Sequence, residues 1–500
     1  MNMQPQPCLP PPALSIAESA LQKAGAAFML YRKIKPERKA GFLRAIASGI
    51  ELLGDTLILQ CVKESNLPAQ RLESERRRTC EQLRSFAALV EEGSWVEATA
   101  DFAQPDKKPL PKPDLRKMLI PLGPVVIFGA ANFPLAYSTA GGDTASALAA
   151  GCTVVVKAHP AHVQTSVMVA ECIRKASILW KIPEDVFQHI VQSDLETGQA
   201  LVLHPLTAAV GFTGSFKGGY ALFQLANNRP RPIPVFAEMS SVNPICILPG
   251  ILQEQASVIA GKIVNSVLNN MGQFCTKPGL LFVMDDEHLP GFVSELQIKW
   301  RDSIPEPMLH TGILNAYMER RSELLKFEPV HMEACSLKAP AGSEGYPTLA
   351  SVAANKFIME PRMHTEVFGP FTLLVLCRNQ AEMITSLNCL QGQLTGSVFG
   401  TLQELKENQA LLDSLSLLAG RIIINGVPTG VEVCNSMVHG GPFPASSDSR
   451  YSAVGASAIK RFVRPQCYQN FPDELLPEEL KDENYKEEKQ RSNGMPGQKM

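Results

Sequence analysis

One cysteine of this 500-residue chain stands in a turn that would expose its thiol. Cys275 lies in the glycine-flanked segment Gly272 to Gly279, directly after the predicted helix Leu252 to Leu268. An accessible thiolate can act as a nucleophile, whereas cysteines inside apolar strands, such as Cys246 and Cys377, are inert. The spacing alone leaves two interpretations open, a nucleophile or an ordinary free thiol.

A thiol protease would also need a histidine base. The sequence marks none for Cys275, because no histidine lies between His204 and His288. A distant histidine could reach the thiol only through the fold. The cysteine by itself therefore does not indicate a protease.

Two further polar residues follow apolar runs. Glu238 ends the run Pro234 to Ala237, where a buried carboxylate is costly unless it is protonated, paired or functional. A raised pKa would suit a base that activates water, and the alternative is a surface acid at a strand end. Asn132 follows the run Val125 to Phe128, so its amide could stabilise an oxyanion or simply form a turn.

The segment Gly211 to Gly219 has the pattern of a strand, a glycine-rich turn and the start of a helix. Backbone N–H groups at such a helix terminus can hold a pyrophosphate. The segment is neither GxGxxG nor a P-loop, so the signal is weak when taken alone.

The elements that must position these residues alternate between strands and helices. We predict strands at 125–128, 154–156, 209–212 and 235–237, with helices at 144–150, 166–176 and 219–227 between them. A second alternating block runs from Ile245 to about Asn425, and residues 13–100 have helical periodicity. This alternation predicts an α/β fold with a doubly wound parallel sheet.

Composition excludes several classes of protein. The hydrophobic fraction is 45% and the net charge is −2, which rule out a mainly disordered chain and give no reason to expect nucleic acid or anionic membrane as partner. The apolar runs fall far short of the ~20 residues of a membrane span. The twelve cysteines form no CxxC pair. We therefore expect reduced thiols, no metal site, no signal peptide in Met1 to Pro12 and a cytoplasmic location.

Six motifs occurring in one order resemble those of the aldehyde dehydrogenase superfamily over Lys112 to Pro472. They are Asn132 to Leu135, Lys157 at a strand end, Gly211 to Ser215, Glu238, Cys275, and Glu366 to Pro370. The resemblance implies a Rossmann-type cofactor domain (1–112 and 125–244), a catalytic domain (245–454) and small β oligomerisation elements (113–124 and 455–472). We expect the tail, 477–500, to be disordered.

The resemblance also implies roles for single residues. Cys275 would attack the aldehyde, Asn132 and the Cys275 N–H would hold the oxyanion, and Glu238 would activate water to hydrolyse the thioester. The expected cofactor contacts are Lys157 and Glu366 on the ribose hydroxyls, Gly214, Ser215 and Gly219 at the pyrophosphate, and Phe368 near the nicotinamide. Phe133 and Arg450 are the expected substrate contacts.

The sequence departs from the common family pattern at two places. Many members have a glutamate three residues after the strand-end lysine, where it binds the adenosine ribose, and this chain has Pro160 there. No acid at that position repels a 2′-phosphate, so we expect NADP as the preferred cofactor, with NAD possible and His159 as a candidate phosphate partner. Ser240 and Ser241 replace the usual pair of glycines after the catalytic glutamate.

The stretches 128–138, 140–152, 235–239 and 428–433 resemble the subgroup of α-ketoglutarate semialdehyde (2,5-dioxopentanoate) dehydrogenases. The expected reaction is therefore oxidation of that aldehyde to 2-oxoglutarate by a homodimer or homotetramer. A broad or long-chain aldehyde dehydrogenase, similar to that of luminous bacteria, is the alternative. Two further classes are a CoA-acylating enzyme, against which Glu238 argues, and a non-catalytic protein that retains the fold.

Overall fold

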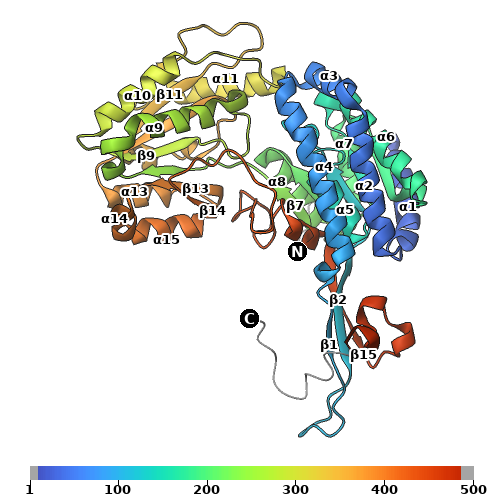
Figure 1. The fold of residues 1–500 in the computed structure, drawn as a ribbon. Helices are drawn as coiled ribbons and strands as arrows, with labels where there is room; N and C mark the ends of the chain where they lie inside the picture. The colour runs from blue at the N-terminus through green and yellow to red at the C-terminus, as the bar shows by residue number, and fades with distance from the viewer. Residues whose placement is uncertain (1–8, 486–500) are drawn as a thin grey trace.

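The computed structural model describes residues 9–485, which form two lobes and a projecting arm (Figure 1). Four helices open the chain and pack on the first lobe. Proline occupies the first turn of α1 and α2, where its missing N–H costs no hydrogen bond. The bounds of the four are α1 Pro11–Tyr31, α2 Pro36–Leu52, α3 Gly54–Ser65 and α4 Ala69–Glu92.

The first lobe is built on a five-stranded parallel sheet with the order β5-β4-β3-β6-β7. All four residues of β4, Val-Val-Val-Lys, are buried, as expected for a parallel strand covered by helices on both faces. The strands are β3 Val125–Phe128, β4 Val154–Lys157, β5 Phe187–Ile190, β6 Ala209–Thr213 and β7 Val235–Glu238, and the helices are α5 Gly142–Ala150, α6 Val163–Leu179, α7 Leu195–Leu203 and α8 Phe216–Asn227.

The predicted strands and helices of this lobe are all present, but the sequence prediction missed two elements. Strand β5 reads Phe-Gln-His-Ile and is buried only at its two ends, so it lacks the apolar run that identified the other strands. Helix α7 has nine residues and begins at an Asp194 cap. Both are too short to give a clear periodic signal.

The second lobe is built on a seven-stranded sheet with the order β10-β11-β12-β9-β8-β13-β14, in which only β10 is antiparallel to its neighbour. Its strands are β8 Ile245–Ile247, β9 Leu280–Met284, β10 His331–Cys335, β11 Thr348–Ala353, β12 Phe371–Cys377, β13 Gln393–Phe399 and β14 Ala419–Ile424. Helices cover both faces: α9 Pro249–Leu268, α10 Leu289–Arg301, α11 Thr311–Leu325, α12 Ala354–Met359, α13 Gln380–Leu387, α14 Leu402–Glu407 and α15 Gln409–Leu418.

The arm is a three-stranded antiparallel sheet with the order β1-β2-β15 (Figure 1). Strands β2 Leu115–Pro121 and β15 Val463–Gln469 fall within the segments expected to serve oligomerisation. Strand β1, Thr99–Asp101, was expected to belong to the cofactor domain instead. The arm therefore begins earlier in the chain than the sequence prediction placed it.

The expectation of a disordered tail from residue 477 is wrong for residues 477–485. Two short 3-10 turns, Glu478–Leu480 and Asp482–Tyr485, pack against the arm. Leu480 is fully buried there, and Arg116 donates to the Leu480 carbonyl and pairs with Asp482. The charge run that suggested disorder thus supplies partners for a buried arginine. Residues 1–8 and 486–500, on which the predictions for the two ends partly rest, lie outside the described residues.

No single helix among the described residues is long and apolar enough to cross a membrane. The bent pair α2 and α3 meets that test jointly, by length and composition only. The cysteines among residues 9–485 are all free.

Candidate active site

Glu238 is the last residue of β7, at the carboxyl edge of the five-stranded sheet. It is 5% exposed, and a single bridge pairs its backbone with Ser446 from the late part of the chain. Oε2 of its carboxylate has no hydrogen-bond partner among the described residues, and Oε1 has only the ring nitrogen of His439, 2.9 Å away, as a charge partner. A buried carboxylate in this state is held for an interaction that the resting fold does not complete.

Cys275 stands in a turn whose backbone leaves the helical conformation. After α9, the residues Asn270 (φ 46), Met271 (φ 53) and Gly272 (φ 62) all adopt the left-handed region. A Cβ on Gly272 would lie 2.2 Å from the Gly369 carbonyl oxygen, so only glycine permits this approach. The turn is pinned by the Asn243 amide, which donates to the Cys275 carbonyl at 2.8 Å.

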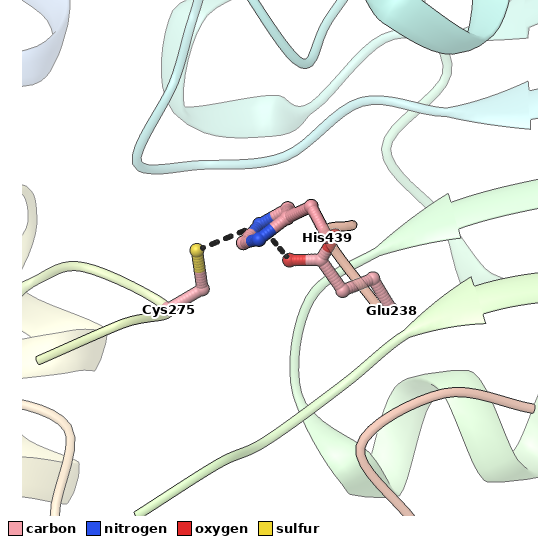
Figure 2. Close-up of side chains that lie close together, drawn as sticks. All are labelled: Glu238, Cys275 and His439. Carbon is pink, nitrogen blue, oxygen red and sulfur yellow. Dashed lines mark hydrogen bonds and ion pairs between the residues drawn. The ribbon is translucent and has the colours of Figure 1, made fainter. Parts of the chain in front are cut away.

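The structure adds a histidine that the sequence prediction missed. His439 Nε2 lies 3.4 Å from Cys275 Sγ and 2.9 Å from Glu238 Oε1, so one ring nitrogen stands between the thiol and the carboxylate (Figure 2). The reactive atoms of the three side chains lie within 4.8 Å of one another. A histidine in contact with a nucleophile and a carboxylate has the arrangement that activates a thiol.

His439 follows Cys275 by 164 residues and lies in a segment without regular structure. Its ring is 2% exposed, and its backbone is fixed by bonds with Ser452 and Ala453. The one local signal was its place directly before Gly440 and Gly441. Neither periodicity nor spacing from the cysteine could have identified it.

The surroundings of Cys275 disfavour the thiolate in the resting protein. Burial raises the pKa of the Cys275 thiol well above its ordinary value, and the nearby Glu238 carboxylate raises it further. The charge of Arg78 opposes this shift. The thiol is therefore protonated at neutral pH and needs a base within reach, a position that His439 occupies.

Asn132 lies beside the turn that carries Cys275. It follows β3, and its side-chain amide donates to the Gln273 carbonyl at 3.0 Å, two residues before the nucleophile. Phe133 packs edge-on against Phe274, with ring centroids 5.4 Å apart. Arg71 of α4 lies over both rings and donates to the Asn132 carbonyl at 2.6 Å. The Asn132 turn and the Cys275 turn are thus held against each other.

The residues expected to hold a dinucleotide lie along the same sheet edge. Lys157 ends β4 and is largely buried, and its ammonium makes no hydrogen bond or ion pair with any other described side chain. The turn after β6 leads into α8 through Ser215, whose side chain caps Gly218 N–H. A Cβ on Gly219 would lie 2.6 Å from Met239, so the helix approaches the sheet closely. The Lys157 ammonium and the start of α8, both at this edge of the sheet, are the groups that could hold a dinucleotide's ribose and phosphates.

Glu366 and Phe368 lie on the segment between helix α12 and strand β12. Burial raises the pKa of Glu366, and the charge of Lys277 and a hydrogen bond with Ser240 oppose that rise. Lys277 Nζ also donates to the Val367 and Phe371 carbonyls, each at 2.9 Å. Ser240, which replaces a usual glycine, additionally accepts from Phe216 N–H at the start of α8. It therefore joins the helix start to Glu366.

Two expectations about charged partners are not met. Burial and the neighbouring His162, His310 and Lys157 lower the pKa of His159 to about 3, and its Nδ1 accepts from Ala161 N–H. His159 is therefore neutral and cannot supply a charge for a phosphate.

Arg450 is 76% exposed in its side chain and bonds to Asp448 through Nε at 2.8 Å. It makes no hydrogen bond or ion pair with the described residues around Cys275. Arg450 is thus paired with Asp448 at the surface and does not take part in the group of side chains around Cys275.

Comparison with known proteins places the chain among enzymes. The model of the aldehyde dehydrogenase family matches residues 14–446. "Alpha-ketoglutaric semialdehyde dehydrogenase 2" of Azospirillum brasilense is 47% identical over 467 residues, which are 93% of this chain and 89% of that protein. "Alpha-ketoglutaric semialdehyde dehydrogenase" of Acinetobacter baylyi is 44% identical over 472 residues, covering 94% and 89%.

Solved structures confirm the α/β fold with parallel sheets. Betaine aldehyde dehydrogenase of Staphylococcus aureus, solved in complex with NAD+, superimposes with a TM-score of 0.77 at 20% identity, over 91% of this chain and 88% of that one. Proline utilization A of Bradyrhizobium japonicum gives a TM-score of 0.76 at 20% identity, over 93% of this chain and 45% of that chain.

Proposed function

The chain belongs to the aldehyde dehydrogenase family, and from this premise we propose that it oxidises 2,5-dioxopentanoate to 2-oxoglutarate. Two relatives with this substrate in their names match nearly the whole chain at 44% and 47% identity. The observation that supports the chemistry is the contact of Cys275 with His439 and, through it, with Glu238.

The first step in this proposal is activation of the thiol. His439 Nε2 takes the proton from Cys275, and the Glu238 carboxylate stabilises the imidazolium that results. The thiolate attacks the aldehyde carbon to form a thiohemiacetal. The Asn132 amide exchanges its bond to Gln273 for a bond to the new oxyanion, to which the Cys275 N–H also donates.

The cofactor supplies the oxidation. A bound nicotinamide would supply the oxidation as a hydride acceptor, which would leave a thioester on Cys275. Lys157, Glu366 and the start of α8 are the groups of this chain that would hold and orient the dinucleotide.

Water then releases the acid from the thioester. His439 still carries the proton of the thiol at this stage, so Glu238 is the group that takes a proton from water approaching the thioester carbon. The Cys275 thiolate leaves and takes its proton back from His439, and the proton on Glu238 is released to solvent. This step needs a base, whereas transfer to CoA does not, and the buried Glu238 therefore favours hydrolysis over CoA acylation.

NADP is the proposed preferred cofactor. The supporting observation is Pro160, which leaves no acid on the turn after Lys157. Burial lowers the pKa of Lys157, and the carboxylate of Asp194, the cap of α7, opposes that shift. Asp194 is thus an acid whose negative charge acts on Lys157, the residue expected to bind the ribose. Pro160→Glu should shift the preference towards NAD through repulsion of the 2′-phosphate, and Asp194→Asn should favour NADP further.

The experiment is a kcat/KM panel of 2,5-dioxopentanoate, hexanal and decanal, each with NAD and NADP and with or without CoA. We expect the oxo acid with NADP to give the highest value and CoA to have no effect. A higher kcat/KM for decanal would establish the long-chain alternative instead. Cys275→Ser is the control, because a serine hydroxyl is a far weaker nucleophile than a thiolate. If this variant keeps more than about 10% of the wild-type activity, Cys275 is not the nucleophile. A tenfold loss of rate corresponds to a rise in the activation barrier of only ~1.4 kcal/mol, which is too small for the loss of a nucleophile.

We further propose a homodimer or homotetramer assembled through the arm, and a cytoplasmic location. The outer edge of β15 is unpaired within the described chain, which suits pairing with a second copy.

A further inference from the structure

Two arginines near the thiol lack a carboxylate partner. Arg78 lies on α4 of the first lobe and Arg421 on β14 of the second (Figure 1). Among residues 9–485, neither forms an ion pair with an aspartate or glutamate, and the Nε of each is buried without a hydrogen-bond partner. Buried guanidinium N–H groups of this kind are costly unless a ligand completes them.

Arg78 is connected to the nucleophile through two aromatic rings. Its Nη2 donates to Tyr137 Oη at 2.9 Å, and its guanidinium lies 5.5 Å from the centre of that ring. The Tyr137 ring lies 6.3 Å from the ring of His439, which contacts Cys275. The charge of Arg78 also reaches the thiol, since it opposes the rise in the pKa of Cys275.

Arg421 approaches from the other lobe. It donates to the Pro428 and Gly430 carbonyls and to Met437 Sδ, and these bonds leave Nε unused. Burial lowers the pKa of Arg421, and the nearby Cys275 and Tyr137 oppose that shift. Both guanidinium groups therefore lie within electrostatic reach of the same thiol and the same tyrosine.

The fully buried arginines among residues 9–485 have their partners within the chain. Arg461 pairs with Asp143 at 2.7 Å, and Arg116 pairs with three aspartates. Arg229 has no acid, but it donates to three backbone carbonyls. The incomplete bonding of Arg78 and Arg421 is thus a property of the active-site region and not a general feature of the fold.

The side chains between the two arginines are apolar. Phe133 and Tyr137 follow β3 and belong to one hydrophobic cluster with three side chains from the late part of the chain. These three are Val431, Val433 and Met437, which lie in the segment whose groups accept bonds from Arg421. A chain of methylene groups suits this cluster, and a carboxylate at its end suits a pair of guanidinium forks.

We propose that Arg78 and Arg421 bind the carboxylate of an oxo-acid aldehyde whose aldehyde carbon lies at Cys275. The inference rests on the proposed function and specifies how that substrate is selected. It replaces Arg450, which the structure places on the surface in a pair with Asp448.

The test compares 2,5-dioxopentanoate with pentanal, which has the same chain length and no carboxylate. Arg78→Met and Arg421→Met should each lower kcat/KM for the oxo acid by about 30-fold or more, because a desolvated carboxylate loses its partner, while pentanal changes by less than about threefold. Arg450→Met is the matched control and should leave the ratio of the two substrates unchanged. Tyr137→Phe removes the bond to Arg78 without removing its charge, and should largely keep that ratio.

A binding measurement separates this inference from the proposed substrate. Saturating 2-oxoglutarate should protect Cys275 of the wild-type protein from iodoacetamide, and the dissociation constant should rise by about 30-fold in either Met variant. If the wild type prefers hexanal but protection is still lost in the variants, the substrate proposal fails and the carboxylate site stands. If both variants keep the substrate ratio and the protection, the inference is wrong.

Discussion

His439 Nε2 contacts both Cys275 and Glu238, lying 3.4 Å from Sγ and 2.9 Å from Oε1. A neutral ring with its hydrogen on Nδ1 has a free Nε2 that can take the thiol proton, and the imidazolium formed then donates to the carboxylate. This geometry makes the histidine, and not the glutamate alone, the first base for the thiol.

His439→Gln should therefore slow the formation of the thiolate. The raised pKa of Cys275 keeps the thiol protonated, so alkylation by iodoacetamide at pH 7 should fall by about 100-fold, the lower range for loss of a general base. Raising the pH should restore the rate, since hydroxide then removes the proton. His331→Gln, at an exposed position on β10, is the control. An alkylation rate equal to wild type across the pH range would assign His439 a packing role.

Glu238→Gln should separate the two half-reactions. The amide keeps the size of the side chain, and the transfer to the cofactor does not require activation of water. We expect a burst of about one equivalent of reduced cofactor per site followed by slow turnover, the pattern of an accumulating acyl-enzyme. Stopped-flow absorbance measures the burst, and mass spectrometry measures the thioester. Normal turnover without a thioester would make Glu238 a strand-end acid and nothing more.

At the scale of the elements, the nucleophile turn and the segment that carries Glu366 meet backbone to backbone. Gly272 faces the Gly369 carbonyl, and a Cβ on Gly369 would lie 2.4 Å from Tyr317. Lys277 links the two segments through its bonds to Val367 and Phe371. A shift of one segment must therefore move the other, so the proposed cofactor contact Glu366 and the proposed nucleophile Cys275 are mechanically coupled.

Lys277→Met should weaken cofactor binding more than it slows chemistry. The substitution keeps the volume, leaves two buried carbonyls unpaired and removes the positive charge that opposes protonation of Glu366. We expect the dissociation constant of the cofactor to rise by about 10-fold or more at pH 7, the loss that one to two unmade bonds produce. The loss should grow as the pH falls, because Glu366 then becomes neutral.

Fluorescence titration of the oxidised-cofactor complex measures this effect. Lys356→Met, at an exposed position of α12, is the matched control. Unchanged affinity with a reduced kcat would show that Lys277 supports the nucleophile turn and not Glu366.

The whole molecule is two lobes joined at the active site and an arm that stands away from both (Figure 1). The described part of the C-terminal segment covers one side of the arm, where Leu476 and Leu480 pack with Val96, Met118 and Ile120. In the proposed oligomer, a second copy would meet the open edge of β15 and the face of the arm that the C-terminal segment covers.

Leu480→Asp should detach this segment and reduce the oligomer. The change places an unpaired charge where the side chain is fully buried, a substitution of the strongly destabilising kind. Light scattering coupled to gel filtration should show a lower molar mass or a mixture. Leu475→Asp, at a neighbouring position that is 67% exposed, should keep the wild-type mass. A wild-type mass in both variants would exclude the covered face from assembly.

Local patterns of the sequence determined the α/β alternation and the order of the expected site residues. Strands β3, β4, β6 and β7 consist mainly of apolar residues, and short apolar runs that alternate with helical segments can be identified without tertiary context. The same patterns place Asn132 and Glu238 at strand ends and Cys275 after a helix. The carboxyl ends of parallel strands share one edge, which places Asn132 and Glu238 on the same edge of the five-stranded sheet.

Only the tertiary structure decided the partners of these residues. His439, Arg78 and Arg421 reach the thiol from segments that are 164, 197 and 146 residues away in the chain, with no spacing that relates them to it. Whether an arginine can bind a ligand depends on the partners that the fold gives its guanidinium. The fold leaves the Nε of Arg78 without a hydrogen bond, whereas it pairs Arg450 with the nearby Asp448. Side-chain type and order are local properties of a sequence, whereas pairing and burial are set by contacts between distant segments. The sequence therefore identified the candidate nucleophile, Cys275, but not the candidate base beside it, His439.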